Sequence, residues 1–228
     1  MGGGEWIEPR RREGPGEDRT ASGMMGSFIP SWFLVPGYGL RKRPGAVTRL
    51  ALRALALLGK RMAVIEQANE SCLEAVEGIL RECVASMRVA GIEQWDEIYP
   101  TADYFRRDWE GGNLFVMRDG ESRVVGCAGL DERQSPEYES VGWTHKVERI
   151  GVVHRLMISP EQQGKGYAKV LMRGLEEEGR RRGYQAIRLD AFVLNPASLR
   201  LYAGLGYVQC GQVRFRKGEF ACFEKLLG

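Results

Sequence analysis

Beyond Met62 the hydrophobic and polar positions follow two periods, one typical of helices and one typical of strands. Apolar residues three and four positions apart predict helices, and capping residues and glycines delimit them. The predicted helices cover residues 71–91, 101–111, 164–182 and 196–206. Short apolar or alternating runs between them predict strands. The predicted strands cover residues 62–67, 114–117, 123–130, 149–159, 185–193, 207–216 and 220–226.

Local signals mark several of these boundaries. Ser71, followed three residues later by Glu74, has the pattern of a capping box and predicts the start of the first helix. Thr101 is the expected cap of the second helix, and Asp119-Gly120 is typical of a hairpin turn. We expect the charged run 176–182 to lie mostly on the solvent-facing side of its helix.

The predicted elements follow one another in the order β-α-α-β-β-β-α-β-α-β-β between residues 62 and 228. Strands that are interleaved with helices and end in a hairpin predict an α/β domain on a mixed sheet. Because this length is typical of one domain, we expect residues 62–228 to form a single domain.

Residues 1–61 differ from the rest of the chain in composition. They hold 11 Lys and Arg against 5 Asp and Glu, whereas the remaining residues hold 22 against 25. The segment also contains 11 of the 30 glycines and shows no sustained period before Ala46. We therefore expect a basic, Gly-rich and disordered extension ahead of the domain.

Three interpretations of this extension are open. A secretory signal is disfavoured, because the acidic residues Glu5, Glu8 and Glu13 precede any long apolar run. The stretch 46–61 has a basic, helix-like pattern that would suit contact with a membrane surface, RNA or a partner. The interpretation we favour is a dispensable extension, with Met62 as the natural first residue of the domain.

Composition excludes several classes of protein. Hydrophobic residues make up 43% and charged residues 28% of the chain, which fits a folded protein rather than a wholly disordered one. No apolar run approaches the roughly 18 residues of a membrane span, so we expect no membrane-spanning segment. Because residues 62–228 are slightly acidic, the net charge of +3 does not indicate nucleic-acid binding.

The cysteines and histidines bear on metal binding and on location. Five cysteines without a CxxC pair argue against a disulfide framework and a zinc site, and they indicate a reducing compartment. Since the chain has only two histidines, His145 and His154, we expect no metal site. We expect a cytoplasmic protein that is a monomer or a homodimer.

A Gly-rich turn between a predicted strand and a predicted helix is the first candidate for ligand binding. Glycine lets a turn approach a ligand without collisions from Cβ, and the first N–H groups of a helix have no internal partners. Such a turn can bind a pyrophosphate. It matches neither a P-loop nor a dinucleotide-binding fingerprint. Its residues are Gln163, Gly164, Lys165, Gly166, Tyr167, Ala168 and Lys169.

A second segment, residues 195–207, follows the next predicted strand. Together the two segments resemble the GNAT superfamily of acetyl-CoA-dependent N-acetyltransferases. The diphosphate turn of that family, Gln/Arg-x-x-Gly-x-Gly/Ala, is matched from Gln163 to Ala168 without departure. Its pattern Asn-x-x-Ala-x-x-Leu-Tyr-x-x-x-Gly-Phe/Tyr is matched except at Ser198, where the family usually has Ala.

The resemblance covers most of residues 62–228 and implies a GNAT-like fold, with a mixed, mostly antiparallel sheet flanked by helices. It implies acetyl-CoA as co-substrate and an amine as acceptor. The strand residues Leu156, Met157 and Ile158 would pair their backbone with the pantetheine arm of CoA. The turn from Gly164 to Lys169 would hold the diphosphate, and Asn195 would bond the pantetheine arm.

The resemblance also assigns a proton donor, Tyr202, which would protonate the departing CoA thiolate. A phenol with a pKa near 10 keeps its proton at pH 7, which fits this role. The general base is open between three residues. Asp190, five residues before Asn195, is the first choice, because related ribosomal-protein N-acetyltransferases carry a Glu there. His154 is the second, since its ordinary pKa suits a base, and Glu148 is the third.

In GNAT folds two loops usually shape the acceptor pocket, and here they correspond to residues 95–100 and 138–145. Both segments carry aromatic residues beside carboxylates such as Asp96 and Glu97. This combination would suit a small cationic amine through charge and cation–π contact. Two functions stay open: an N-acetyltransferase, or a non-catalytic acyl-CoA-binding module that lacks a working acceptor site.

Overall fold

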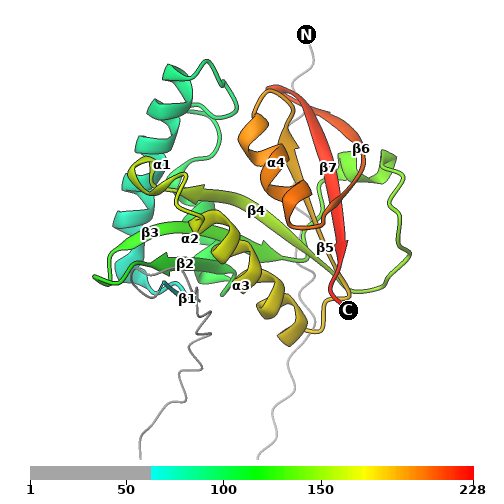
Figure 1. Cartoon of the computed structure of the whole chain (residues 1–228), viewed down its shortest axis with the longest axis horizontal. Coiled ribbons are helices and arrows are strands. Elements are labelled where there is room, and N and C mark those ends of the chain that lie inside the picture. Colours follow the sequence, from blue (N-terminus) through cyan, green and yellow to red (C-terminus); the bar gives the residue numbers. More distant parts are fainter. Residues whose placement is uncertain (1–62) are drawn as a thin grey trace, which may run out of the picture. The chain divides into compact units, whose positions relative to one another are not determined.

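The structure, a computed structural model, describes residues 63–228 (Figure 1). These residues form a seven-stranded sheet with the strand order β1-β2-β3-β4-β5-β7-β6. Neighbouring strands are antiparallel, except that β4 and β5 run parallel. The predictions for residues 1–61 lie outside the described residues. The strands are β1 Val64–Gln67, β2 Leu114–Arg118, β3 Val124–Asp131, β4 Ile150–Ile158, β5 Ala186–Phe192, β6 Val208–Phe215 and β7 Gly218–Leu226.

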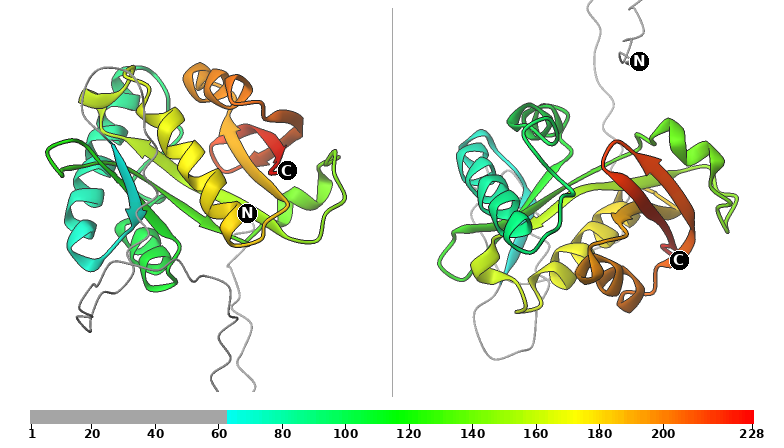
Figure 2. Two further views of the ribbon diagram at one scale, coloured as in Figure 1. Left: turned by 60° about the horizontal axis from the view of Figure 1, so that its bottom comes forward. Right: turned by 90° about the horizontal axis from the view of Figure 1, so that it is seen from above.

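Four α-helices in the described part of the chain cover the two faces of this sheet (Figure 2). The buried side chains of α1 and α2 join a core on one face, and those of α3 and α4 join a core on the other. Each core exists because apolar residues recur on one side of the helices and at alternate positions of the strands. The helices are α1 Leu73–Val89, α2 Ala102–Glu110, α3 Tyr167–Arg181 and α4 Pro196–Gly204.

The predicted order of helices and strands is confirmed, and so is the mixed, mostly antiparallel sheet. Each predicted helix and strand occurs, with ends that differ from the prediction by at most three residues. The sequence pattern did not reveal three short 3-10 turns, because segments of this length carry no period of their own. They are Glu70–Cys72, Pro136–Ser140 and Pro160–Gln162.

The two parallel strands in the middle of the sheet separate along their length. They pair only where Ile150–Val152 of β4 lies beside Ala186–Arg188 of β5. Beyond this point β4 continues along β3, whereas β5 continues along β7, and the two ribbons diverge (Figure 1). Near the centre of the sheet, the divergence leaves one edge of β4 without a strand partner among residues 63–228.

The first helix begins in a different way from the prediction. The 3-10 turn Glu70–Cys72 precedes α1, and the hydroxyl of Ser71 donates to Asn69 Oδ1 at 2.6 Å. The predicted capping box of Ser71 and Glu74 is therefore wrong. The hydroxyl of Ser71 bonds to the side chain of Asn69, and α1 begins without a side-chain capping hydrogen bond. Thr101 occupies the position before α2 as predicted, although its side chain makes no capping hydrogen bond.

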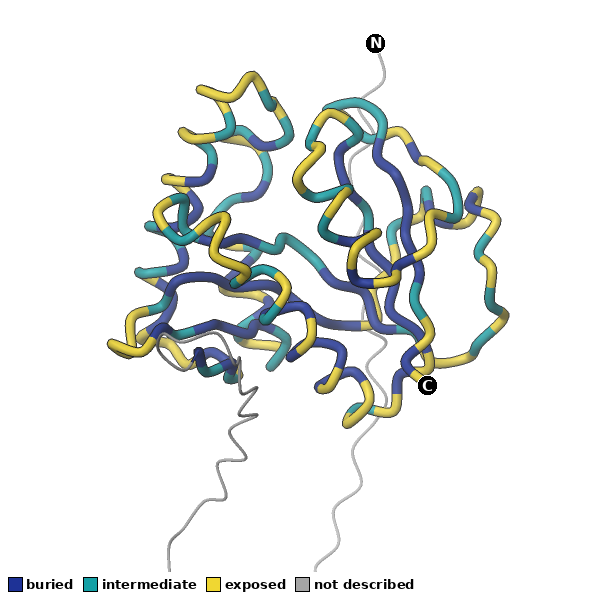
Figure 3. Tube along the Cα trace, viewed as in Figure 1, coloured by how far each residue is buried: buried dark blue, intermediate teal, exposed yellow. Residues whose placement is uncertain are grey.

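The charged run 176–182 of α3 is less exposed than predicted (Figure 3). Glu176 and Glu178 are both buried. Both oxygens of Glu176 accept from Lys225 Nζ at 2.8 Å, and Glu178 accepts from Arg182 Nε at 2.7 Å. The expectation of a mostly solvated run is wrong for these two residues, since a cationic partner lets a carboxylate lie at the sheet surface.

Candidate active site

The Gly-rich turn joins the end of β4 to the start of α3. The 3-10 turn Pro160–Gln162 comes first, and then the side chain of Gln163 donates to the carbonyl oxygen of Ile158 at 3.0 Å. Gly164 and Gly166 have φ angles of 73° and 86°, in the left-handed region that favours glycine. A Cβ added at either position would meet open space, so the turn presents bare backbone to its surroundings.

Five successive backbone N–H groups of this turn, from Gly164 to Ala168, have no acceptor among the described residues. The N–H groups that follow, those of Lys169 and Val170, bond to the carbonyl of Gly166 at 3.1 and 3.2 Å. The five free groups lie at the positive end of the α3 macrodipole. Free N–H groups at a helix start are a binding place for an anion such as a phosphate.

The last residues of β4 have an edge without a strand partner among the described residues, although the carbonyl of Ile158 on it already accepts from Gln163 Nε2 and from Cys83 Sγ. Ser159 N–H donates to the carbonyl of Val125 on β3 at 2.9 Å, and Met157 pairs with β3 two positions earlier. Because backbone groups alternate in direction along a strand, those of Leu156 and Ile158 point away from β3. They point to the side from which β5 has diverged.

Asp190 lies on β5 on the face of the sheet that carries α1 and α2. Its sequence neighbours Leu189 and Ala191 join the core beneath α3 and α4, so Asp190 points to the opposite side. There the hydroxyl of Tyr138 donates to Asp190 Oδ2 at 2.7 Å. Burial raises the pKa of Asp190 above its usual value, and neighbouring donors and cations offset this only in part. The result is a carboxylate with increased affinity for a proton.

Tyr202 lies in α4, on the other face of the sheet. Its side chain is buried, and its ring contacts those of Tyr207 and Phe223 at centroid distances of 6.0 and 5.8 Å. Burial raises the pKa of Tyr202, and the negative charge of Asp190 raises it further. The phenol therefore holds its proton at neutral pH. Packing explains the position of the ring, and the proposed role of its hydroxyl stays a prediction.

The other two candidate bases have different surroundings. His154 lies on the same face as Asp190, and its Nε2 is 2.9 Å from Asp131 Oδ1. Burial alone would raise the pKa of Asp131, but hydrogen bonds with His154 and Arg133 hold that pKa well below its usual range. The charged Asp131 thus orients the His154 ring. Glu148 is exposed and precedes β4, so it lies at the opposite end of the strand from the Gly-rich turn.

Asn195 caps α4 as predicted, since its Oδ1 accepts from the N–H of Ser198 at 3.3 Å. Its Nδ2 donates to Gln94 Oε1 at 3.1 Å. Gln94 belongs to the loop between α1 and α2, so this hydrogen bond joins that loop to the start of α4. The role of Asn195 as a cap is confirmed, and its contact with pantetheine stays a prediction.

Two carboxylates of the loop between α1 and α2, those of Asp96 and Glu97, are paired with basic side chains. Asp96 accepts from Arg216 at 2.7 Å and lies 3.3 Å from the ammonium of Lys217, both in the connection between β6 and β7. Chiefly through Arg216, these contacts hold the pKa of Asp96 well below its usual range. Glu97 pairs with Arg88. Both carboxylates thus have cationic partners in this structure, and the expectation that they attract a cationic amine stays a prediction.

Sequence reasoning missed how Asp190 is held and which side chains support β4. Tyr138 and Asp190 are 52 positions apart, and no motif links them. Arg155 and Asp108 form a buried ion pair, and although a strand and a helix were predicted at their positions, no motif links the two residues. Such partners come together only through the tertiary fold, so no local signal was present to find them.

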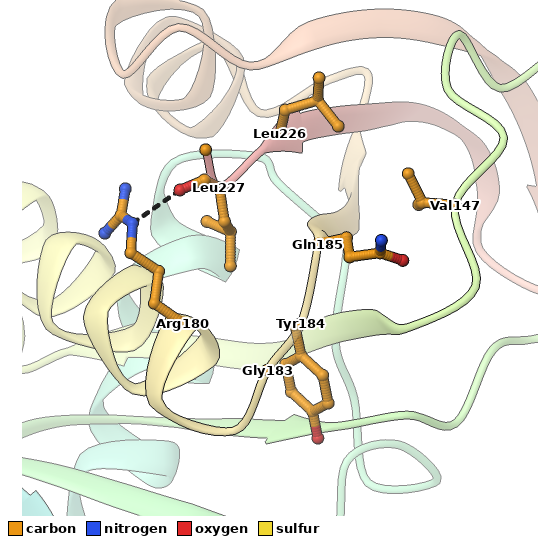
Figure 4. A pocket seen from close by; sticks show the side chains of 8 residues that line it. Val147, Arg180, Gly183, Tyr184, Gln185, Leu226 and Leu227 are labelled. Carbon is orange, nitrogen blue, oxygen red and sulfur yellow. Dashed lines mark hydrogen bonds between the residues drawn. The ribbon is translucent and has the colours of Figure 1, made fainter.

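A surface hollow at the far end of the sheet is separate from this site (Figure 4). Val147 and Gln185, which precede β4 and β5, line it together with Leu227, whose carbonyl accepts from Arg180 Nε at 2.7 Å. Since the Gly-rich turn follows the other end of β4, the nine residues of that strand separate the two places.

The described residues hold no group of three or more His, Cys, Asp or Glu side chains that could bind a metal ion. None of their helices is long and apolar enough to cross a membrane. All five cysteines are free, and burial raises the pKa of Cys83 to about 12. A buried thiol that keeps its proton is a poor nucleophile, so Cys83 is a packing residue.

The sequence and the fold both match known acetyltransferases. The family model of the acetyltransferase (GNAT) family matches residues 78–207, which is more than half of the chain. The chain belongs to the GNAT acetyltransferase family. A GNAT acetyltransferase from Streptococcus agalactiae has the same fold, with a TM-score of 0.66 and 24% identity over 72% of this chain and 95% of that one.

Two further relatives of this GNAT protein bear on its chemistry. The yncA protein from Salmonella typhimurium, solved with its cofactor acetyl-CoA, has a TM-score of 0.55 and 20% identity over 73% of this chain and 94% of that one. Human N-acetyltransferase 8B is 30% identical over 106 residues, which are 46% of this chain and 43% of the human protein. The match thus spans less than half of this curated relative.

Proposed function

We propose that this GNAT protein transfers the acetyl group of acetyl-CoA directly to an amine acceptor, either a small molecule or a protein amine. The observation that carries the proposal is the row of five free N–H groups from Gly164 to Ala168, directly after the open edge of β4. A diphosphate and an extended amide-containing arm are the two parts of CoA that such a site complements. The word N-acetyltransferase in the name of the human relative supports nitrogen as the acceptor atom.

The residues present fit acetyl-CoA in three places. The turn residues Gln163 to Lys169 would bind its diphosphate through backbone N–H groups. The backbone of Leu156 and Ile158 would pair with the amides of pantetheine, where β4 lacks a strand neighbour among the described residues, whereas the backbone of Met157 faces β3 and supports the strand from the other side. Asn195 would contribute its side-chain amide once the hydrogen bond with Gln94 is exchanged.

The acceptor amine must be neutral before it can attack the thioester. For an amine with a pKa near 10.4, neutralisation at pH 7 costs about 4.6 kcal/mol, whereas an α-amine with a pKa near 7.8 needs about 1 kcal/mol. Asp190 would take this proton, because its carboxylate has no ion-pair partner among the described residues and a raised pKa. His154, held by Asp131, is the second candidate on the same face.

The transfer itself forms a C–N bond and breaks the C–S bond of the thioester that acetyl-CoA supplies. The N–H of Leu156 would polarise the acetyl carbonyl and stabilise the negative charge that develops on its oxygen. Tyr202 would donate its proton to the departing thiolate. Because Asp190 and Tyr202 lie on opposite faces of the sheet, the amine would lose its proton on one side of the thioester, and the departing sulfur would gain a proton on the other side.

The remaining parts of the proposal concern where the activity resides. We place it in a domain of residues 62–228, because the site, both cores and the family match all lie there. Five free cysteines suit a reducing, cytoplasmic environment.

Calorimetric titration of the full chain with acetyl-CoA tests the binding part of this proposal. We expect one-to-one binding that is lost in Gly166→Glu, because a side chain and a negative charge then stand where the diphosphate would lie. Gly206→Glu is the matched control, since Gly206 has a similar φ of 83° and equally open surroundings outside the turn. Equal affinity in both variants would contradict diphosphate binding at the turn.

Turnover of a Tyr202→Phe variant separates a transferase from a non-catalytic acyl-CoA-binding module. We expect the variant to bind acetyl-CoA normally and to lose about 100-fold in kcat, because the ring packing is kept and only the proton donor is removed. Tyr207→Phe, a change at a neighbouring buried ring, is the control. Unchanged turnover in Tyr202→Phe would contradict the assigned role.

A further inference from the structure

Arg155 has a backbone conformation that is rare for its residue type. Its φ of 49° lies in the left-handed region, which residues other than glycine seldom adopt. The register between β3 and β4 shifts at this point, so that Arg155 and Leu156 together oppose the single residue Ala128. This bulge directly precedes the open edge of β4, where the backbone has no partner from β5.

The side chain of Arg155 is buried on the face of the sheet that carries α1 and α2, the face to which Asp190 points, and only 7% of its surface is exposed. Its guanidinium donates to Asp108 on α2 and to the hydroxyl of Tyr99 at 3.3 Å, and it lies 5.4 Å from the ring centroid of Tyr104. Its Nε is buried without an acceptor. A side chain that combines backbone strain, a buried charge and an unsatisfied donor requires a functional explanation.

The ion pair of Arg155 continues into a chain of contacts that returns to the same strand. Asp108, which is 1% exposed, also accepts from Arg133 at 2.7 Å. Arg133 donates to Asp131 at 2.6 Å, and Asp131 bonds His154 at 2.9 Å. The adjacent residues His154 and Arg155 are therefore both held from outside β4, one through β3 and the other through α2.

We infer that Arg155 and Asp108 form a positioning pair that holds the β4 bulge, and with it the Leu156 N–H, in the direction needed to polarise the acetyl carbonyl. A hydrogen-bond donor accelerates acyl transfer only when it is already aimed at the developing oxyanion. In a fully paired strand, hydrogen bonds with the neighbouring strands fix the direction of each N–H group. At Leu156, however, β4 is no longer paired with β5. The anchored guanidinium supplies the missing constraint. The inference rests on the proposed function.

A purely structural role accounts poorly for this pair. Replacement of a buried ion pair by well-packed apolar residues is often neutral or stabilising, so burial of two charges is weak evidence for a contribution to stability. The pair instead connects three elements at one strained residue: the bulge of β4, helix α2 through Asp108 and the acceptor loop through Tyr99. Loss of the pair should therefore change the chemistry more than the fold.

The carbonyl stretch of bound acetyl-CoA, labelled with ¹³C at the acetyl carbon and recorded by isotope-edited infrared spectroscopy, tests the inference without a known acceptor. In the full-length wild type we expect a shift to lower frequency relative to free acetyl-CoA, since a hydrogen bond weakens the C=O bond. In Arg155→Lys, which keeps the charge but not the two-point contact, we expect most of this shift to be lost, with unchanged affinity for acetyl-CoA.

Arg182→Lys is the matched control. Arg182 likewise pairs with a buried carboxylate, Glu178 at 2.7 Å, and lies 5.1 Å from the ring centroid of Phe115, but it lies outside the proposed site. We expect it to keep the wild-type carbonyl frequency. With the amine that the wild type acetylates best, we expect kcat to fall about 10- to 100-fold in Arg155→Lys and to stay unchanged in Arg182→Lys.

The double variant Arg155→Met/Asp108→Leu guards against a trivial loss of folding, because it removes both charges together. We expect it to show wild-type circular dichroism and acetyl-CoA binding, and to lack the carbonyl shift. A wild-type carbonyl frequency in either Arg155→Lys or the folded double variant would overturn the inference while the proposed function stands. Failure of the wild type to bind acetyl-CoA would overturn the proposed function and the inference with it.

Discussion

At the scale of single residues, burial has opposite consequences for the two proposed proton carriers. The pKa of Asp190 and that of Tyr202 are both raised by burial. For a carboxylate a raised pKa means a stronger base, whereas for a phenol it means that the proton stays in place until a basic group appears. Burial therefore suits Asp190 to accept a proton, whereas it makes the proton of Tyr202 harder to remove, so the donor role proposed for Tyr202 rests on its place in the sequence motif and not on its pKa.

The pH profile of activity tests the role of Asp190. Since the carboxylate must be ionised to accept a proton, we expect kcat/KM to fall on the acid side through an apparent pKa above the ordinary value of about 3.9. Asp190→Asn should lower kcat/KM by about 100-fold or more for a lysine-like amine, and less for an α-amine. Glu148→Gln, which changes an exposed carboxylate outside the site, should have the wild-type profile. Equal effects of the two substitutions would contradict this assignment.

Acid unfolding tests the state of Asp131. Its folded-state pKa lies well below the usual range, so it contributes stability that is fully present above about pH 4 and is lost as the pH falls toward the lowered pKa. We expect Asp131→Asn to lower the free energy of unfolding at pH 7, and this difference from the wild type should shrink below pH 4. Denaturant titrations between pH 7 and pH 2 measure it. A difference that does not vary with pH would show that Asp131 contributes no charge-dependent stability.

At the scale of the elements, side-chain hydrogen bonds and ion pairs, rather than strand pairing, hold the strand end and the loop around the proposed site. The loop between α1 and α2 is joined to the β6–β7 connection through Asp96 and to the start of α4 through Gln94. The end of β4 is held by the pair of Arg155 and Asp108. The contacts of Asp96 and Gln94 join the two parts of the molecule between which β4 and β5 diverge. The pair of Arg155 and Asp108 fastens β4 itself to α2.

Removal of one such contact should loosen a loop and leave the fold intact. Arg216→Ala removes the main partner of Asp96, and we expect faster amide hydrogen exchange around residues 94–99. Because the guanidinium of Arg216 is half exposed, solvent screens this ion pair, and we expect little change in the free energy of unfolding. Arg214→Ala, which breaks an exposed pair with Glu219 on the same hairpin, is the control. Wild-type exchange in Arg216→Ala would show that this ion pair does not fasten the loop.

At the scale of the whole molecule, the period of apolar residues and the turn glycines were sufficient to predict the element order and the Gly-rich turn. These features depend on short-range geometry that a sequence displays directly. The burial of Glu176 could not be predicted, because its partner Lys225 lies 49 positions away. The hydrogen bond between Tyr138 and Asp190 depends in the same way on how distant segments meet. Sequence motifs predicted the cofactor side of the proposed site, whereas only the fold revealed how the side chains on the face of Asp190 are held.

The most direct test of the central claim is the response of backbone amides to acetyl-CoA in the nuclear magnetic resonance spectrum of the ¹⁵N-labelled full chain. We expect the largest amide shifts from Gly164 to Ala168 and further shifts at Leu156 and Ile158, because their free N–H groups gain acceptors. Saturable binding that leaves these amides unchanged, and instead shifts residues such as Gln185 around the distant hollow, would contradict it.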